Sequence, residues 1–388
     1  MLFTIIIFFA VLAVMVFVHE LGHFFTARKL GVKAEEFGFG LPPRIGGWKK
    51  VGGKWKFFLG NQPPEEIQSE DTIYSLNWLP VGGFVKIKGE NGEGVSDPDS
   101  FANKKIWKRA MILSAGVIMN VVLCFFCLSL AFFIGAPQFV DEPKAGLAVV
   151  DQKIQIVAVV KDSPAEKAGL AVGDALLEID GQKFAAIAAV QEFVGAREGK
   201  ILPIVIDRFG ERKEFAVAPV KLTETGKAGF GVGLATSGIV SYPWYAAIWL
   251  GLKSTLFLAW QIILAFYTLI KNAIVGLPLG VDLAGPVGIA VMTGKVARLG
   301  FVHILQFTAL LSMNLAIINF LPFPALDGGR ILFLIIEKIK GKAVNQKVEQ
   351  IAHTIGFALL MILIVIVTGR DFFKFKDSFI NLWHKIIS

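Results

Sequence analysis

Long apolar runs alternate with charged stretches along the chain. Residues 2–18, 110–140, 299–326 and 351–369 contain no charged side chain. A helix needs about 20 largely apolar residues to cross the hydrocarbon core of a bilayer. The pattern therefore predicts a polytopic α-helical membrane protein with four transmembrane helices, the first of which is expected to continue to about Ala27.

Composition and charge support a membrane protein and predict its orientation. Hydrophobic residues make up 54% of the chain, and no Lys or Arg precedes the first apolar run, so a cleavable signal peptide is not expected. Residues 28–109 carry 14 Lys and Arg against 10 Asp and Glu, which predicts a cytoplasmic loop and an external N-terminus. The net charge of +8 is attributed to topology and lipid head groups, and no nucleic-acid partner is expected.

Residues 136–225 have the character of a water-soluble domain. Strands are expected at 154–160, 176–180, 201–207 and 214–220, with a short helix after the capping residue Ser163 and another helix at 190–196. This order resembles a bacterial PDZ domain, which binds extended peptides by adding a strand to a sheet edge. A small β-rich spacer without a ligand is the alternative, and it stays open.

A metal-ligand motif, His19-Glu20-Leu21-Gly22-His23, follows the first apolar run directly. Histidines four residues apart share one face of a helix and can bind one ion. Glu20 stands beside the first histidine, where a carboxylate can act as general base toward a zinc-activated water. Two imidazoles and a carboxylate are costly in an apolar segment, which favours a functional site over a histidine pair packed against other polar groups.

The third ligand is expected from Asp327, which follows the third apolar run and precedes Gly328 and Gly329. Catalytic zinc usually takes three protein ligands and leaves one position for water. His19, His23 and Asp327 complete such a set. Taken alone, Asp327 is equally well explained as a helix-capping residue, but beside the histidine motif the ligand role is favoured.

Both motifs and the domain between them resemble a known family. The His-Glu-x-x-His motif at residues 19–23, the run Asn319-Phe320-Leu321-Pro322-Phe323-Pro324-Ala325-Leu326-Asp327-Gly328-Gly329 and the interposed PDZ-like domain are similar to the site-2 protease family. These are intramembrane zinc metalloproteases, and the resemblance is to the bacterial members that cleave anti-sigma factors. The best-known of those members carry two PDZ domains, whereas this chain has room for one.

The resemblance implies a function, a cofactor and a location. It implies Zn2+ bound by His19, His23 and Asp327, with Glu20 taking a proton from water and passing it to the leaving amine. The implied substrates are single-span membrane proteins, such as anti-sigma factors or signal-peptide remnants, cut by regulated intramembrane proteolysis. The implied location is the bacterial inner membrane, with the PDZ-like domain external and the zinc site near the cytoplasmic side.

A fifth apolar stretch, residues 244–270, is interrupted by Lys253 and tests this assignment. If it crossed the bilayer, Asp327 would emerge on the external face while His23 lies near the cytoplasmic one. Three ligands about 2 Å from one ion cannot be divided between two membrane faces. The stretch is therefore expected to be external or partly embedded, and its Trp residues suit a membrane interface.

Substrate binding is expected from an alternating strand and from two asparagines. Phe84, Val85, Lys86 and Ile87 resemble the membrane-associated β-element of the family, where an edge strand can hold an unwound substrate extended. Asn319 and Asn314 are expected to add side-chain hydrogen bonds to that substrate. An ordinary cytoplasmic hairpin is the alternative for the strand.

The expected organisation follows from these patterns. It comprises a first transmembrane helix at 1–28, a cytoplasmic loop with the β-element at 29–106, a second transmembrane helix at 107–135, the PDZ-like domain at 136–225, an external or partly embedded amphipathic region at 226–298, the third transmembrane helix with the Leu-Asp-Gly-Gly segment at 299–340, and the fourth transmembrane helix with a C-terminal tail at 341–388.

Several other features carry less weight. The run Ala115-Gly116-Val117-Ile118-Met119-Asn120 is similar to a family motif in which proline usually follows the glycine, so Val117 is a departure. Residues 285–289 are expected to form a turn, and His353, without ligand spacing, is expected to have a packing or interfacial role. Two other classes of protein stay open: a silent membrane scaffold presenting the PDZ-like domain, and a metal transporter.

Overall fold

The structure is a computed structural model that describes residues 2–67, 69–92, 94–140, 149–222, 226, 228–277 and 285–374. The chain forms two compact units. Unit 1 combines Met1–Leu128, Leu252–Gly294 and Gln306–Ser388, and unit 2 combines Ser129–Gly251 and Lys295–Leu305.

Five helices are long and apolar enough to cross a membrane. They are α1 (Leu2–Lys29), α2 (Ile106–Ile134), α5 (Trp244–Val275), α7 (Phe301–Phe320) and α9 (Gln346–Lys374). Four of them correspond to the expected transmembrane helices, and α5 is the fifth apolar stretch. By length and composition α5 also qualifies, so the count of four is not confirmed.

Two shorter helices complete this set, α6 (Pro286–Arg298) and α8 (Asp327–Lys340). The expected turn at residues 285–289 is therefore wrong, because Pro286 begins α6. Proline is well suited to the first position of a helix, where its missing N–H would have no intrahelical partner. The side chain of Asp371 accepts a hydrogen bond from the Gly288 N–H at 2.6 Å, so a buried carboxylate from α9 satisfies the start of α6.

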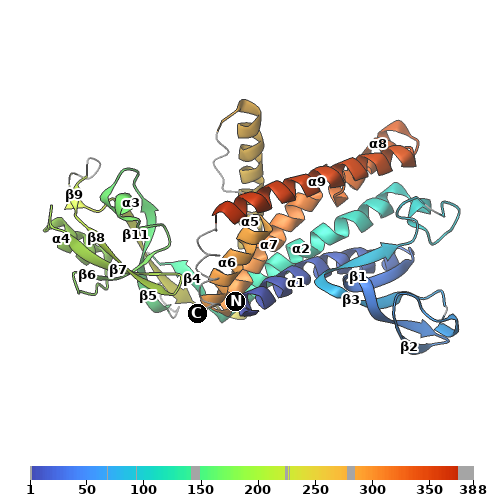
Figure 1. The fold of residues 1–388 in the computed structure, drawn as a ribbon, viewed down its shortest axis with the longest axis horizontal. Helices are drawn as coiled ribbons and strands as arrows, with labels where there is room; N and C mark the ends of the chain where they lie inside the picture. Colours follow the sequence, from blue (N-terminus) through green and yellow to red (C-terminus); the bar gives the residue numbers. More distant parts are fainter. Residues whose placement is uncertain are drawn as a thin grey trace. The chain divides into compact units, whose positions relative to one another are not determined.

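The helices of unit 1 run between two common ends. At one end α6 contacts both the start of α1, through Gly294 and Thr4, and the end of α9, through Gly288 and Asp371. At the other end the Gln346 side chain donates to the Gly92 carbonyl at 2.6 Å, and Arg109 at the start of α2 pairs with Glu337 at the end of α8. In Figure 1, α1, α2, α7 and α9 lie alongside one another, whereas the later part of α5 leaves this bundle at a steep angle.

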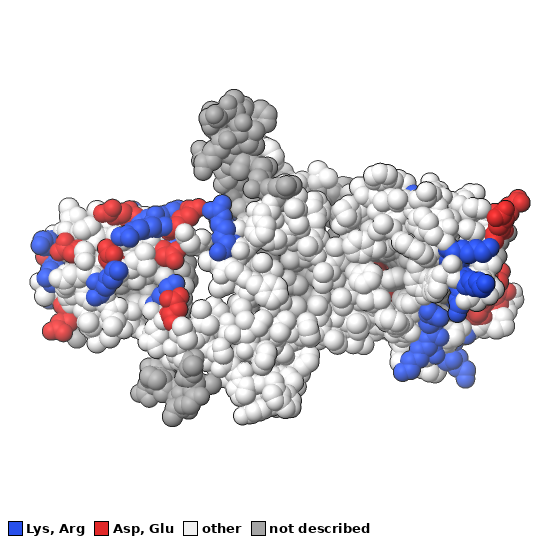
Figure 2. Space-filling view, turned by 90° about the horizontal axis from the view of Figure 1, so that it is seen from below, with Lys and Arg blue, Asp and Glu red and all other residues white. Residues whose placement is uncertain are grey.

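The surface of these helices is apolar. In the most apolar windows of α5 and α9 only 6% of residues are buried, although the windows contain almost no charge. On the face seen in Figure 2, charged side chains of unit 1 gather at the end that carries its β-sheet, and the helical surface beside them is uncharged. Helices that are hydrophobic all round need an apolar surrounding, which for an exposed helix is lipid.

A three-stranded antiparallel sheet follows α1. Its strands are β1 (Ala34–Val51), β2 (Lys54–Leu59) and β3 (Ile73–Ile87), in the order β2-β1-β3, with the short helices η1 (Glu65–Ile67) and η2 (Phe101–Asn103) in the loops around it. The alternating strand expected near residue 84 is the end of β3, which is an edge strand. One face of the sheet exposes large apolar side chains: Trp48, Trp55, Phe57, Leu59, Leu76 and Trp78.

Unit 2 contains a six-stranded sheet in the order β4-β11-β5-β6-β7-β8. Its elements are β4 (Ala136–Phe139), β5 (Val149–Val159), α3 (Pro164–Ala168), β6 (Ala175–Ile179), α4 (Ile187–Gly195), β7 (Leu202–Arg208), β8 (Glu211–Val217), β9 (Val220–Lys221), β10 (Ala228–Gly229) and β11 (Val232–Val240). The expected order of strands and helices is observed. Ser163 caps α3 by accepting a hydrogen bond from the Glu166 N–H at 3.2 Å.

The expected end of this domain at residue 225 is wrong, because β11 lies inside the sheet. β11 pairs with β4 on one side and with β5 on the other. Its sequence, VGLATSGIV, is rich in small residues and gives a weak strand signal. β11 becomes a central strand through pairing with strands that are distant in the sequence, and the residues of β11 alone do not show this pairing.

A buried ion pair in the PDZ-like domain generates a stability prediction. Asp174, 1% exposed, receives two hydrogen bonds of 2.6 Å from Arg208, and this bonding raises the pKa of the Arg208 guanidinium. Arg208→Leu leaves the carboxylate buried and unpaired, and should destabilise the domain by about 3–5 kcal/mol. Thermal unfolding and pulse proteolysis of the full chain in detergent measure the change.

Arg212→Leu is the matched control. Arg212 pairs with Glu178 at 3.3 Å, but its side chain is 65% exposed, and the loss of an exposed pair should cost less than about 1 kcal/mol. Equal effects of the two substitutions would contradict the assignment of the Asp174 pair as a structural element.

Candidate metal centre

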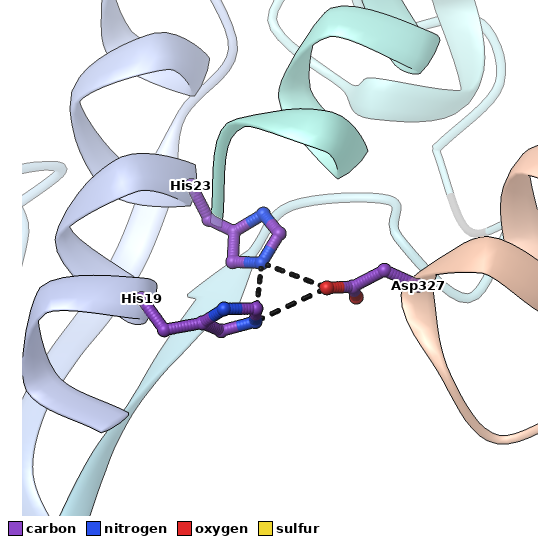
Figure 3. Close-up of side chains that lie close together, drawn as sticks. All are labelled: His19, His23 and Asp327. Carbon is purple, nitrogen blue, oxygen red and sulfur yellow. Dashed lines mark hydrogen bonds and ion pairs between the residues drawn. The ribbon is translucent and has the colours of Figure 1, made fainter. Parts of the chain in front are cut away.

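His19 and His23 lie on one face of α1, where the four-residue spacing predicted them. Each is 6% exposed, and their Nε2 atoms are 3.2 Å apart. Figure 3 shows both imidazoles projecting from α1 toward Asp327, which approaches from the first turn of α8. The structure therefore brings together the three expected ligands, although the histidines and Asp327 are about 300 residues apart along the chain.

Asp327 reaches this position through a compact turn between α7 and α8. Gly328 packs against the carbonyl oxygens of Phe320 and Leu321, so closely that a Cβ at residue 328 would overlap them. A Cβ at Gly329 would lie 2.8 Å from the Phe323 carbonyl carbon. The two glycines thus allow the turn to fold back on the end of α7. Asp327 is the first residue of α8, and Leu326 holds the capping position, so the alternative of Asp327 as N-cap is not observed.

The three ligand atoms have the spacing of a tetrahedral metal site. Asp327 Oδ2 lies 3.1 Å from His19 Nε2 and 3.4 Å from His23 Nε2. Metal–ligand bonds of 2.0–2.2 Å in a tetrahedron place ligand atoms roughly 3.3–3.6 Å apart, and the separations here lie within about 0.2 Å of that range. Asp327 Oδ2 is buried and accepts no hydrogen bond from the described residues. The lone pairs of the two imidazole nitrogens and the carboxylate oxygen thus lie close together, and no such hydrogen bond offsets the burial of the carboxylate oxygen. A cation bound by all three atoms would stabilise this arrangement.

The outer nitrogens of both imidazoles are engaged by α2. His23 Nδ1 lies 2.8 Å from the Ile112 carbonyl oxygen, which can only accept, so Nδ1 carries the proton and Nε2 is free to bind a metal. His19 Nδ1 lies 3.2 Å from the amide nitrogen Nδ2 of Asn120, a residue with no exposed surface. For His19 Nε2 to bind a metal, this amide must present its oxygen to Nδ1–H.

A single face of α2 forms the wall behind the site. Ile112, Gly116 and Asn120 are spaced by four residues and face α1 together. Gly116 is essential to the approach, because a Cβ there would lie 2.7 Å from His19 Cε1 and still closer to His23 Nε2. The Asn120 carbonyl in turn accepts a hydrogen bond of 2.9 Å from Ser312 on α7.

The carboxylate of Glu20 points to the β-sheet. Its Oε2 accepts a hydrogen bond of 3.1 Å from the Val85 N–H. That N–H belongs to the edge strand β3 and is directed away from β1. The expected base and the expected substrate-binding strand are therefore direct neighbours, and Phe84, Lys86 and Ile87 continue the same strand.

The two asparagines differ in position. The Asn319 amide lies 3.5 Å from His19 Nε2, beside the ligand set. The Asn314 amide donates to the Leu310 carbonyl of its own helix at 2.9 Å, and no described contact links it to the ligands. The structure thus brings Asn319, but not Asn314, to the metal centre.

Two residues of the site were not assigned a role from the sequence. Asn120 and Gly116 were recognised only as parts of a family-like run. The available signal was their spacing, since a buried amide four residues after a glycine in an uncharged span is costly without a partner. Their partners lie on another helix and become visible only in three dimensions.

Comparisons with known proteins agree with this geometry. Residues 7–61 and 65–363 match the profile of peptidase family M50. A Clostridium perfringens protein assigned as a zinc metalloprotease is 34% identical over 367 residues, which cover 94% of this chain and 98% of that protein. The zinc metalloprotease RasP of Geobacillus kaustophilus is 29% identical over 457 residues, covering 96% of this chain and 98% of its own length.

Solved structures match only a part of the chain. The PDZ domain of an SdrC-like protein from Listeria innocua is 25% identical and covers 21% of this chain and 92% of its own length, with a TM-score of 0.20.

Gly116→Ala is expected to abolish metal binding, because the added methyl group occupies the space of the two imidazoles. Metal retained by the purified full chain, measured by elemental analysis, should fall to background. Gly369→Ala in α9 is the control, since a Cβ there meets nothing within 4 Å. Full metal retention in Gly116→Ala would show that the ligand set is not packed against α2 in this way.

Proposed function

This chain belongs to peptidase family M50 and is a zinc metalloprotease, and we propose that it acts inside the membrane. It hydrolyses peptide bonds in or near the transmembrane segments of single-span membrane proteins. The observation that carries the proposal is the meeting of His19, His23 and Asp327, at tetrahedral spacing, with Glu20 beside them.

Zinc suits this site. Relatives that align over nearly the whole chain are named as zinc metalloproteases, and a His-His-Asp set leaves one of four positions for water. Asp327 Oδ2 is buried and accepts no hydrogen bond within the described part of the chain, and Gly116 leaves room for the imidazoles but not for a side chain. When bound, zinc acidifies a water molecule and polarises the scissile carbonyl.

The remaining steps belong to residues of the chain. Glu20 accepts the proton of the attacking water and later delivers it to the leaving amine. The Ile112 carbonyl holds His23 in the tautomer whose Nε2 carries the lone pair, and the Asn120 amide would do the same for His19 with its oxygen turned to Nδ1. Asn319, 3.5 Å from His19, is placed to contact the substrate backbone, and the same role for Asn314 requires a rotation away from Leu310.

Strand β3 is the proposed binding edge for an unwound substrate. A peptide bond inside a helix is protected by intrahelical hydrogen bonds, so the segment must become extended before hydrolysis. Residues Phe84, Val85, Lys86 and Ile87 belong to the edge strand of the described sheet, and a substrate strand would replace Glu20 as the partner of the Val85 N–H. The exposed Trp and Phe side chains of the same sheet suit the membrane interface, which supports membrane association of this β-element.

Four helices are proposed to cross the membrane, namely α1, α2, α7 and α9. The start of α1 and the end of α9 both contact α6, which fits an even number of crossings. If α5 crossed as well, the ten residues between Val275 and Pro286 would have to return to α6 across a core of about 30 Å. Fully extended they reach roughly 33 Å, with unpaired backbone groups in lipid, which is strongly unfavourable.

A reporter fused to the C-terminus tests this topology. Four crossings place both termini on the same side of the membrane, which the positive-inside rule predicts to be the external side of a bacterial inner membrane. A fused alkaline phosphatase, active only outside the cytoplasm, should therefore be active, and a fused fluorescent protein that folds only in the cytoplasm should be dark. The opposite result would require five crossings and would exclude the proposed zinc site.

The PDZ-like domain is proposed to bind a peptide or a substrate segment outside the membrane. Among the residues that the structure describes, the half of β11 near Val232 pairs with β5 and has no partner strand on its other side, because the pairing with β4 covers only Ser237–Val240. An open strand edge of this kind is what β-augmentation uses.

Glu20→Gln tests the proposed chemistry. The amide cannot accept a proton, so cleavage of a single-span substrate reconstituted with the full chain should fall by about 10²–10⁴-fold. Zinc content should be unchanged, because Glu20 is not a ligand. Glu65→Gln, on the exposed short helix η1, is the control and should cleave normally.

Other functions predict different results. A scaffold that presents the PDZ-like domain would behave identically with either substitution, because it needs no base. A metal transporter would carry zinc across the membrane of a vesicle. In a protease, Glu20→Gln should keep zinc and lose cleavage, whereas a transporter has no cleavage activity to lose.

A further inference from the structure

We propose that His353 of α9 is a positioning residue for the metal centre, and that it acts by holding the backbone of the turn that presents Asp327. The inference rests on the proposed function, since it concerns a ligand of the same zinc site. His353 lies 26 residues beyond Asp327 in the chain and carries no ligand spacing, so the sequence predicted only a packing or interfacial role.

The turn contains a strained residue two positions before the ligand. Ala325 has φ of +82°, the only non-glycine residue of unit 1 with positive φ among those described. Residues with a Cβ disfavour this conformation, and such residues persist only where their surroundings hold them. Whatever holds Ala325 therefore also fixes the direction in which Asp327 leaves the turn.

His353 supplies the contact. Its Nδ1 accepts a hydrogen bond of 2.9 Å from the Ala325 N–H. Because Nδ1 accepts, the proton of the neutral ring is on Nε2. The ring of Phe333 on α8 lies 5.7 Å from the His353 ring, which restricts its orientation. The imidazole is thus held between α8 and the turn that begins it.

Gly356 brings α9 close enough for this bond. It lies three residues after His353, on the same face of α9. A Cβ at residue 356 would be 2.7 Å from the carbonyl carbon and from the Cβ of Pro324. Two adjacent residues of the turn, Pro324 and Ala325, are therefore contacted by two residues one helical turn apart, and α9 acts as a clamp on the turn.

The other side of His353 opens to a cavity of about 460 Å³ between α8, α9 and the loop after β3, which both apolar and charged side chains line. His353 Nε2 is buried, has no hydrogen-bond partner among the described residues, and lies 3.9 Å from a carboxylate oxygen of Glu349. Arg330 pairs with Glu90 across the same cavity. These charged neighbours allow an imidazole to stay in this position between α8 and α9, where a leucine would pack but could not accept the bond from Ala325.

Three substitutions of His353 separate its hydrogen bond from its volume. Asn places an acceptor near the position of Nδ1, Gln places one near Nε2, and Leu has none. The purified full chain is loaded with zinc, and zinc affinity is measured by competition with a chromogenic chelator. His353→Leu and His353→Gln should weaken zinc affinity by roughly 10-fold, as is usual for outer residues that orient metal ligands, and His353→Asn should retain it within about threefold.

A second substitution tests the link through Ala325. Glycine adopts φ of +82° without steric cost, so a turn with Ala325→Gly depends less on the bond from His353. Ala325→Gly combined with His353→Leu should recover at least part of the lost zinc affinity. With cobalt in place of zinc, the visible absorption bands report the ligand geometry and should change in His353→Leu and return in the double variant.

The outcomes distinguish this inference from the proposed function. His303→Leu, in α7, is the control for loss of a membrane-helix histidine and should bind zinc as the wild type does. A wild-type chain that binds no zinc would overturn the proposed function. Zinc bound equally by wild type and His353→Leu would overturn only the role of His353. Equal losses in the Asn and Leu variants without rescue by Ala325→Gly would likewise overturn it, in favour of a packing role.

Discussion

One requirement governs this molecule: three side chains from two distant parts of the chain must reach one point inside a bilayer. His19 and His23 come from α1, and Asp327 comes from the first turn of α8. Ligands within about 2 Å of an ion allow almost no error in depth. In the proposed topology, the number of crossings between α1 and α8 and the non-crossing course of α5 follow from that one meeting point.

The requirement also explains how the neighbouring elements are used. α2 forms the inner wall and engages both outer imidazole nitrogens through the Ile112 carbonyl and Asn120. β3 borders the site on another side and contacts Glu20 through Val85. Each contact comes from a different element, so the geometry of the centre depends on the packing of the whole of unit 1.

The sequence predicted what depends on local pattern and missed what depends on distant partners. The helical register of His19 and His23 is local, and the resemblance to site-2 proteases that it carried is confirmed by membership of family M50. Gly116 and His353 matter only because other helices approach them. The small residues of β11 gave little strand signal, because its pairing partners lie up to about 100 residues away. For α5, hydropathy alone does not separate a crossing helix from an interfacial one.

The contacts that position the three ligands are those available to helices surrounded by lipid. Between helices in lipid the hydrophobic effect provides no driving force, because lipid tails are as apolar as the side chains they replace. Position must then come from close backbone contact and from hydrogen bonds. Gly22 against Ala115, and Gly356 against Pro324, allow backbones to approach to distances that a Cβ would prevent.

Hydrogen bonds orient the ligand side chains, which close backbone contacts alone do not do. Ser312 bonds to the Asn120 carbonyl, and the Asn120 amide bonds to His19, which links α7 through α2 to a ligand on α1. A soluble enzyme can rely on a large apolar core to support such a chain of bonds. In this protein the small residues and the side-chain hydrogen bonds together position the ligands. A single added methyl group at the α1–α2 contact is therefore expected to disturb the ligand geometry more than the loss of a large side chain facing lipid.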